Sequence, residues 1–307
     1  MTRTRFRLAH LSDPHLPFDP VGDGLGEKRL TIKQRMALQS WRRKRRHIST
    51  LSPDRALRDD LAAFGSDHVA VTGDLVNLGT TIEYRRARSW LERIGPADAV
   101  SVAPGNHDAT ARGTLADGFA QWQPFMSGDA PAPTGAVFPF LRVRGPVAIV
   151  ALCSAIPTRP GSAAGRLGHR QIARAAALLE EASRRGLFRI VLIHHPPFLG
   201  PGGPRKALRD RGPLRRMLGR TGAELVLHGH HHRASLAHLQ GPAGPIPVFG
   251  VPAALASSPR PELGGWLAHT VRPDGAGWML DTTLRRYDPA HGRFEAERCW
   301  RHLLFRS

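Results

Sequence analysis

Five short motifs in the chain combine aspartate, asparagine and histidine with glycine or proline. They are, in order, "SDPHL" (12–16), "GD" (73–74), "GNHD" (105–108), "HHPP" (194–197) and "GHHH" (229–232). Carboxylates, amide oxygens and imidazoles bind divalent metal ions. Two such ions about 3.5–4 Å apart can hold a phosphate group and activate a water molecule. Each motif alone is common, but the set of five indicates a two-metal site for phosphoester chemistry.

Each motif lies at the end of a predicted strand. Apolar runs that predict strands cover 6–12, 68–74, 99–108, 147–154, 188–197 and 223–229. Helical patterns lie between them at 54–65, 81–95, 168–186 and 212–222. This alternation predicts an α/β fold, in which functional sites form at the carboxyl ends of strands. The segment 125–139 has the composition of an irregular loop.

The spacing inside two motifs suggests which side chains can act together. Residues two apart in an extended segment point to the same side. By this rule the side chains of Asp13 and His15 point to the same side. Those of His230 and His232 also share a side, and His231 points away from them. A role for His231 at the rim of the site, facing substrate, follows.

The adjacent pair His194 and His195 raises a choice. In an extended segment, neighbouring side chains point to opposite sides, so only one ring is expected to reach the site. Alternation alone does not choose between the two. His228, at the end of its strand, is expected to be a buried supporting histidine.

Taken together, the five motifs resemble the signature of the calcineurin-like metallophosphoesterases, DxH, GD, GNH[DE], a histidine-containing turn and GHxH. The resemblance covers roughly residues 6–232. "HHPP" and the context of "GHHH" look most like bacterial class III cyclic-nucleotide phosphodiesterases. The resemblance implies a two-sheet mixed β-sandwich flanked by helices. It also implies two divalent metal ions, for which mixed nitrogen and oxygen ligands leave Mn, Fe and Zn open.

The resemblance also assigns roles to residues. The first ion is expected on Asp13, His15, Asp74 and His232, and the second on Asp74, Asn106, His194 and His230. Asp74 then bridges the ions, and His194 is the expected ligand of its pair. His107 is expected to contact the phosphate or protonate the leaving group. Asp108 is expected to orient His107 by accepting its ring N–H.

The charge balance is strongly basic, with 44 Lys and Arg against 25 acidic residues and a formal net charge of +19. Such a charge favours contact with polyanions, although an arginine bias can also reflect coding composition. No apolar run reaches about 18 residues, and the N-terminus lacks a signal-peptide pattern, so a cytoplasmic protein is expected. Two cysteines, Cys153 and Cys299, cannot form a disulfide framework and are expected to be buried.

A basic insert at about 27–50 separates the first two motifs. Lys28 to His47 contains nine Lys or Arg and no acid, with Trp41 and several aliphatic residues between them. A solvated helix is one interpretation. An anionic membrane surface bound through 28–47, peripherally on the inner face, is another, and nucleic acid is a third.

A second basic group lies at 203–216, between the last two motifs. Arg205, Lys206 and Arg209 are candidates for holding a substrate phosphate, and a plain helix surface is the alternative. We expect a single domain over 1–307, with a β-rich antiparallel closing portion at about 245–307. The sequence carries no signal for an oligomeric state.

The predicted activity is hydrolysis of a phosphodiester, with a cyclic nucleotide of the 3',5'-cAMP type as the first candidate substrate. A nucleotide-sugar or lipid-linked pyrophosphate comes second because of the basic insert, and nucleic acid comes third. An inactive metallophosphoesterase-like scaffold is the alternative from another class. All seven expected ligands and His107 are present, which argues against that alternative.

Overall fold

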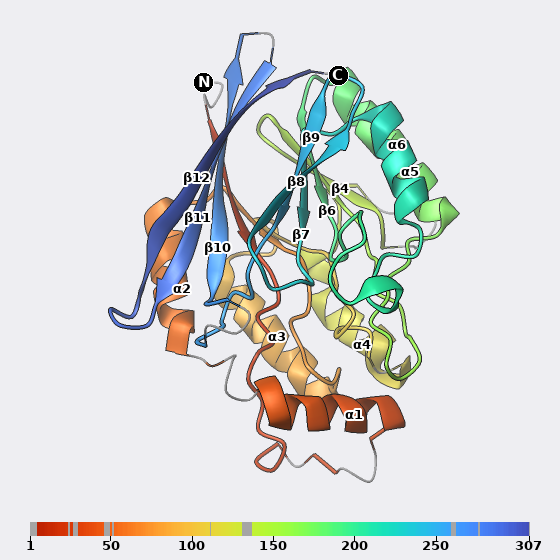
Figure 1. Ribbon diagram of the computed structural model, residues 1–307, viewed down its shortest axis with the longest axis vertical. Helices are drawn as coiled ribbons and strands as arrows, with labels where there is room; N and C mark the ends of the chain where they lie inside the picture. The colour runs from red at the N-terminus through yellow and green to blue at the C-terminus, as the bar shows by residue number, and fades with distance from the viewer. Residues whose placement is uncertain are drawn as a thin grey trace.

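The structure is a computed structural model that describes residues 5–23, 25–26, 30–45, 50, 52–110, 112–130, 137–258, 262–275 and 277–306. Two mixed six-stranded sheets pack face to face, with helices around them (Figure 1). This arrangement confirms the two-sheet mixed sandwich flanked by helices.

The first sheet has the order β12-β11-β10-β1-β2-β3. Its strands are β1 (Phe6–Leu11), β2 (His68–Val71), β3 (Val100–Val102), β10 (Gly265–Asp274), β11 (Gly277–Asp288) and β12 (Arg293–Phe305). Strand β1 pairs in parallel with β2 and antiparallel with β10, so that Leu8 lies opposite both His68 and His269. The three C-terminal strands therefore extend this sheet as an antiparallel meander.

The second sheet has the order β4-β5-β6-β7-β9-β8. Its strands are β4 (Phe140–Arg144), β5 (Val147–Ala151), β6 (Phe188–Leu192), β7 (Leu225–His228), β8 (Ser235–Gln240) and β9 (Pro245–Gly250). The four inner strands β5, β6, β7 and β9 are parallel to one another. Strand β9, predicted as part of the closing portion, belongs to this sheet because it pairs with β7 and β8.

The main core lies between the two sheets. It combines Leu8 from the first sheet with Ile149 and Leu192 from the second, all fully buried. A second core lies beneath α5 (His169–Arg184) and α6 (Arg211–Thr221), which cover the other face of the second sheet (Figure 1). The buried positions of α5 recur every three or four residues, as expected for a helix with one apolar face.

The remaining helices are α1 (Ile32–Ser40), α2 (Ser52–Phe64), α3 (Thr81–Ile94) and α4 (Arg112–Trp122). Helix α1 forms part of the basic insert and lies at the end of the molecule opposite the two termini (Figure 1). Thr31 caps α1, and Leu38 packs with Phe18, Leu30 and Leu78. Among the described residues, no helix is long and apolar enough to cross a membrane.

Several predictions differ from the structure in detail. The predicted strands 99–108 and 188–197 end at Val102 and Leu192, because the motif residues beyond them form turns. The expectation of two buried cysteines is wrong: Cys153 is half-buried and Cys299 is exposed on β12. Cys299 is exposed because most side chains of strand β12 face solvent.

Candidate metal centre

The five motifs meet at the carboxyl ends of β1, β2, β3, β6 and β7. Backbone hydrogen bonds join the motif turns to one another. The Asp13 N–H donates to the Gly73 carbonyl (2.9 Å), and the His15 N–H donates to the Asp74 carbonyl (3.1 Å). The Gly229 N–H donates to the His194 carbonyl (3.1 Å). These bonds join the turn of the first motif to that of the second, and the turn of the fourth motif to that of the fifth, although the joined turns come from distant parts of the chain.

One group of possible metal ligands consists of Asp13, His15, Asp74 and His232, whose ligand atoms lie within 4.8 Å of one another. His232 Nε2 lies 3.1 Å from Asp13 Oδ1 and 3.2 Å from His15 Nε2. Asp13 Oδ1 is buried and has no hydrogen-bond partner among the described residues. A buried carboxylate oxygen without a donor, facing ring nitrogens, fits a bound cation.

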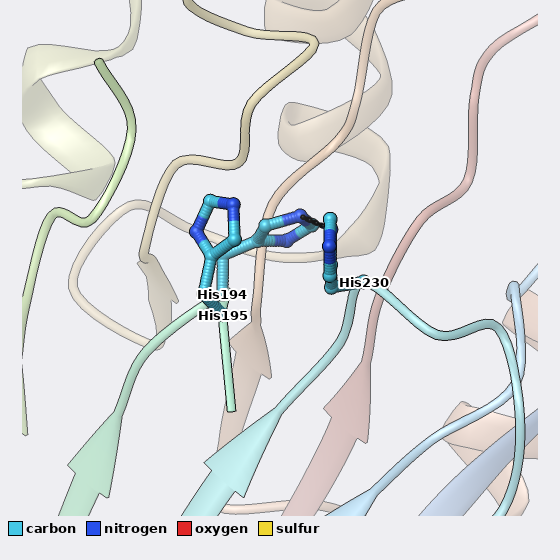
Figure 2. Close-up of side chains that lie close together, drawn as sticks. All are labelled: His194, His195 and His230. Carbon is cyan, nitrogen blue, oxygen red and sulfur yellow. Dashed lines mark hydrogen bonds between the residues drawn. The ribbon is translucent and has the colours of Figure 1, made fainter. Parts of the chain in front are cut away.

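A second group contains His194, His195 and His230, again within 4.8 Å of one another (Figure 2). His194 Nε2 lies 3.2 Å from His230 Nδ1 and 3.3 Å from Asn106 Oδ1. Asp74 Oδ2 is 3.5 Å from this same nitrogen and 3.7 Å from His15 Nε2. Asp74 therefore lies between the two groups.

The rings of His194 and His195 do not point to opposite sides as expected. Their centroids are 4.9 Å apart, because both residues lie in a bend after β6 where the strand alternation has ended (Figure 2). Both nitrogens of His195 have protein partners, Ser154 Oγ at 2.8 Å and the Ala163 carbonyl at 3.0 Å. This leaves His194 as the member of the pair that faces Asp74.

Three of the rings that face the site have their outer nitrogens fixed by backbone carbonyls. The pairs are His15 Nδ1 with Val76 (3.3 Å), His194 Nδ1 with Thr72 (2.6 Å) and His230 Nε2 with Lys206 (2.8 Å). A carbonyl requires a proton on the nitrogen that it faces. The opposite nitrogen then directs a lone pair into the site, as in histidines that bind metal ions.

Five of the residues in these two groups have a backbone conformation that is uncommon outside glycine. Their φ angles are positive: Asp13 (49°), His15 (40°), Asp74 (54°), His230 (72°) and His232 (53°). The extended geometry assumed for their spacing is therefore wrong, since a residue with such a φ angle is not extended. Strained conformations of this kind cluster at functional sites.

Two motif glycines leave room for these side chains. A Cβ on Gly105 would lie 2.3 Å from Asp74 Oδ1 and 2.7 Å from His194 Cε1. A Cβ on Gly229 would lie 1.8 Å from Ser12 Oγ and 2.5 Å from Asp13 Oδ2. Any larger residue at either position would displace a side chain of the site.

His107 borders the site, but Asp108 does not hold it in the expected way. The two oxygens of the Asp108 carboxylate accept four backbone N–H groups, from Asp74, Leu75, Val76 and Gly105, at 2.8–3.2 Å. His107 Nδ1 instead faces the Asn77 carbonyl at 2.8 Å. Asp108 thus fixes the turn that carries Asp74, and Asn77, which sequence reasoning missed in "GDLVN", orients His107.

The electrostatics of the site favour an anionic Asp13 and a neutral His230. Burial raises the pKa of Asp13, but the neighbouring His232 and His194 outweigh it and hold that pKa well below its ordinary value. Desolvation, and then the neighbouring histidines, lower the pKa of His230 well below its ordinary value. Burial and the charge of Asp74 raise the pKa of Asp108 to about 7.

The predicted substrate-binding residues lie at different depths. Arg205, Lys206 and Arg209 have exposed side chains, and Lys206 contacts the site through its backbone carbonyl. His231 is half-buried beside the His230 ring, with centroids 5.4 Å apart. His228 is fully buried, as expected.

The donor set and its geometry fit two divalent cations that share Asp74, and the fold and site define a class of metal-dependent phosphoester hydrolases. A family model of the calcineurin-like phosphoesterases matches residues 6–234. The chain belongs to this family and is a phosphoester hydrolase with a centre for two divalent metal ions.

A probable cyclic nucleotide phosphodiesterase from Synechococcus sp. is 33% identical over 205 residues, which cover 65% of this chain and 70% of the relative. Two solved structures share the fold. A dimetal phosphatase from Danio rerio has a TM-score of 0.62 at 12% identity, covering 98% of this chain and 99% of the phosphatase. A purple acid phosphatase from yellow lupin has a TM-score of 0.60 at 15% identity over 97% of this chain, which spans 53% of the lupin enzyme.

Proposed function

We propose that this protein hydrolyses a phosphodiester, and specifically a 3',5'-cyclic nucleotide. The observation that carries the proposal is the position of Asp74 Oδ2 between His15 Nε2 and His194 Nε2, at 3.7 and 3.5 Å. The likeness to a relative named as a probable cyclic nucleotide phosphodiesterase supports the choice of substrate.

In this proposal, each group of side chains holds one ion. Asp13, His15, Asp74 and His232 hold the first, and Asp74, Asn106, His194 and His230 hold the second. When bound, the pair of divalent ions supplies hydroxide at neutral pH and neutralises charge on the phosphate. His195 supports His230 by ring contact, with centroids 4.5 Å apart.

His107 delivers a proton to the leaving oxygen in this proposal. The Asn77 carbonyl accepts the Nδ1–H of the ring, so in the protonated imidazolium the Nε2–H is the group that can donate to substrate. The His107 backbone N–H donates to Asp74 Oδ1 at 2.7 Å, which keeps the ring beside the carboxylate that both ions share.

A substrate panel tests the proposal. The protein loaded with Mn²⁺ is offered cAMP, a nucleotide-sugar pyrophosphate and a short single-stranded DNA, with metal content measured on the same sample. The proposal expects 5'-AMP from cAMP at a kcat/KM at least about tenfold above that for the other two substrates, and no product with EDTA. A fully loaded sample that leaves cAMP intact while cleaving another member of the panel would contradict it.

A second candidate substrate is a lipid-linked pyrophosphate at a membrane surface. The observation that favours it is the outer side of α1, where Ile32 (71% exposed) and Met36 (47% exposed) stand beside exposed Arg35. Exposed aliphatic and cationic residues on one helix suit an anionic lipid surface. The rest of the predicted 28–47 patch includes Lys28, which lies outside the described residues.

Vesicle binding tests this second candidate. Ile32→Ser with Met36→Ser should weaken co-sedimentation with vesicles that contain phosphatidylserine several-fold, and should leave hydrolysis of a soluble diester unchanged. The second candidate is abandoned if the wild-type protein binds anionic and neutral vesicles equally.

A further inference from the structure

Lys33 lies on α1 of the basic insert. Its side chain is partly buried, unlike the exposed Arg35, Arg42 and Arg43 of the same insert. Its Nζ donates a hydrogen bond of 2.7 Å to Thr158 Oγ1. Burial lowers the pKa of Lys33, and the charge of Asp74 opposes that effect. Lys33 therefore stands within electrostatic reach of the carboxylate at the middle of the site.

The contacts of α1 explain this position. Gln34, the next residue, donates from Nε2 to the Leu78 carbonyl at 3.2 Å. Leu78 follows Asn77, whose carbonyl holds the His107 ring. Leu38 packs on the same Leu78, so two contacts fix α1 to the segment that follows Asp74. The helix is attached to one wall of the site.

Thr158 belongs to the opposite wall. Its hydroxyl donates to the Ser162 carbonyl at 2.6 Å. The adjacent Ala163 presents its carbonyl to His195 Nε2 at 3.0 Å, and its N–H donates to the Arg205 carbonyl at 2.9 Å. The Lys33 side chain thus extends from the wall that carries Asp74 and His107 to the wall that supports His195.

We propose that Lys33 binds a non-bridging oxygen of the substrate phosphate, and that α1 holds it over the metal centre for that purpose. A hydroxyl is a weak partner for an ammonium group, and a phosphate oxygen is a stronger one. A substrate phosphate can therefore take the place of the Thr158 hydroxyl as the partner of Lys33. Sequence reasoning placed the phosphate-binding cations at 205–209, whose side chains are exposed.

Binding of inorganic phosphate to the protein loaded with Mn²⁺, measured by calorimetry, tests this assignment without turnover. Lys33→Met should weaken the phosphate Kd at least about tenfold, since a hydrogen bond to a charged group is lost. Lys33→Arg should restore it to within about threefold. Arg43→Met, which removes the same charge from an exposed site of the same insert, should leave it unchanged.

Thr158→Val separates phosphate binding from a purely structural contact. This variant removes the hydroxyl but keeps the ammonium, so phosphate affinity should stay within about threefold of wild type. A loss as large as that of Lys33→Met would show that only the contact between the two walls matters, and would overturn the proposal. Since Thr158→Val retains Lys33, a large loss of phosphate affinity in this variant can overturn the proposal even if Lys33→Met folds poorly.

Steady-state kinetics on bis-p-nitrophenyl phosphate give a second readout. Lys33→Met should raise KM about tenfold and change kcat less than about threefold, the pattern of a lost binding contact. An unchanged KM together with an unchanged phosphate Kd, at full metal content, would also overturn the assignment.

Discussion

Asp74 Oδ2 lies 3.5 Å from His194 Nε2, although the two residues follow strands of different sheets. Strand β2 of the first sheet leads to Asp74, and β6 of the second leads to His194. The Thr72 carbonyl receives the His194 Nδ1–H at 2.6 Å, which fixes the ring toward the carboxylate. The site therefore forms only when the two sheets are packed together.

Replacement of His230 and of His231 should have different effects on metal content. His230 has its Nδ1 directed at the site and its Nε2 on the Lys206 carbonyl, whereas His231 stands beside it, half-buried. His230→Ala should lose about one of two ions, and His231→Ala should keep both. Metal analysis after Mn²⁺ loading and desalting measures this. Equal metal content in the two variants would show that the assignment of His230 is wrong.

Loss of the His107 ring should reduce the rate of hydrolysis without loss of metal. General acid catalysis contributes roughly 10²–10⁴-fold, so His107→Gln should lower kcat by about that factor. The loss should be greater for a phenyl phosphodiester than for its p-nitrophenyl analogue, because phenolate is the poorer leaving group. Rate constants for both substrates measure the effect. An equal loss on both would exclude proton donation by His107.

The buried His68 should make the protein less stable in acid. Its Nε2 bonds to Ser101 Oγ at 2.8 Å, and burial, together with Arg142 and Arg144, lowers its pKa to about 3. Below pH 6.5 the unfolded chain binds the proton and the folded chain does not, so the free energy of unfolding falls as pH falls toward 3. Between pH 7 and pH 5, this histidine should lower the free energy of unfolding by roughly 2 kcal/mol.

His68→Gln, which keeps a hydrogen-bonding group near Ser101, provides the comparison. Both proteins are unfolded with urea in EDTA at pH 7 and pH 5. The free energy of unfolding should fall less between these pH values in the variant than in the wild type, by roughly 2 kcal/mol. An identical loss in both proteins would mean that His68 takes up its proton in the folded state.

The sequence predicts the elements that carry the ligands better than it predicts the shape of the site. Strands with continuous apolar runs, such as β5 and β6, are evident because both faces are buried. Strand β12 is not distinguished within the predicted β-rich portion, and a helix at α1 is only one of the interpretations of the basic insert, since their mostly exposed positions leave no clear apolar period. The sequence predicts the motif residues, but it does not predict that their backbone departs from the extended conformation.

Roles that depend on long-range packing could not be predicted from local spacing. Asn77 acts on His107 through its backbone carbonyl, which any residue would provide. Lys33 depends on a contact with Thr158, far along the chain. Asp108 was assigned to His107 because the two are adjacent, whereas its carboxylate faces four backbone N–H groups of the site turns.

Metal content of Asp74→Ala tests the central claim most directly. Wild-type protein loaded with Mn²⁺ and desalted should retain about two ions per chain, and Asp74→Ala should retain fewer than about one, since both ions share this carboxylate. Asp59→Ala, at a side chain that is 71% exposed on α2, serves as the control and should retain both ions. A folded Asp74→Ala protein that still holds two ions would contradict the shared carboxylate.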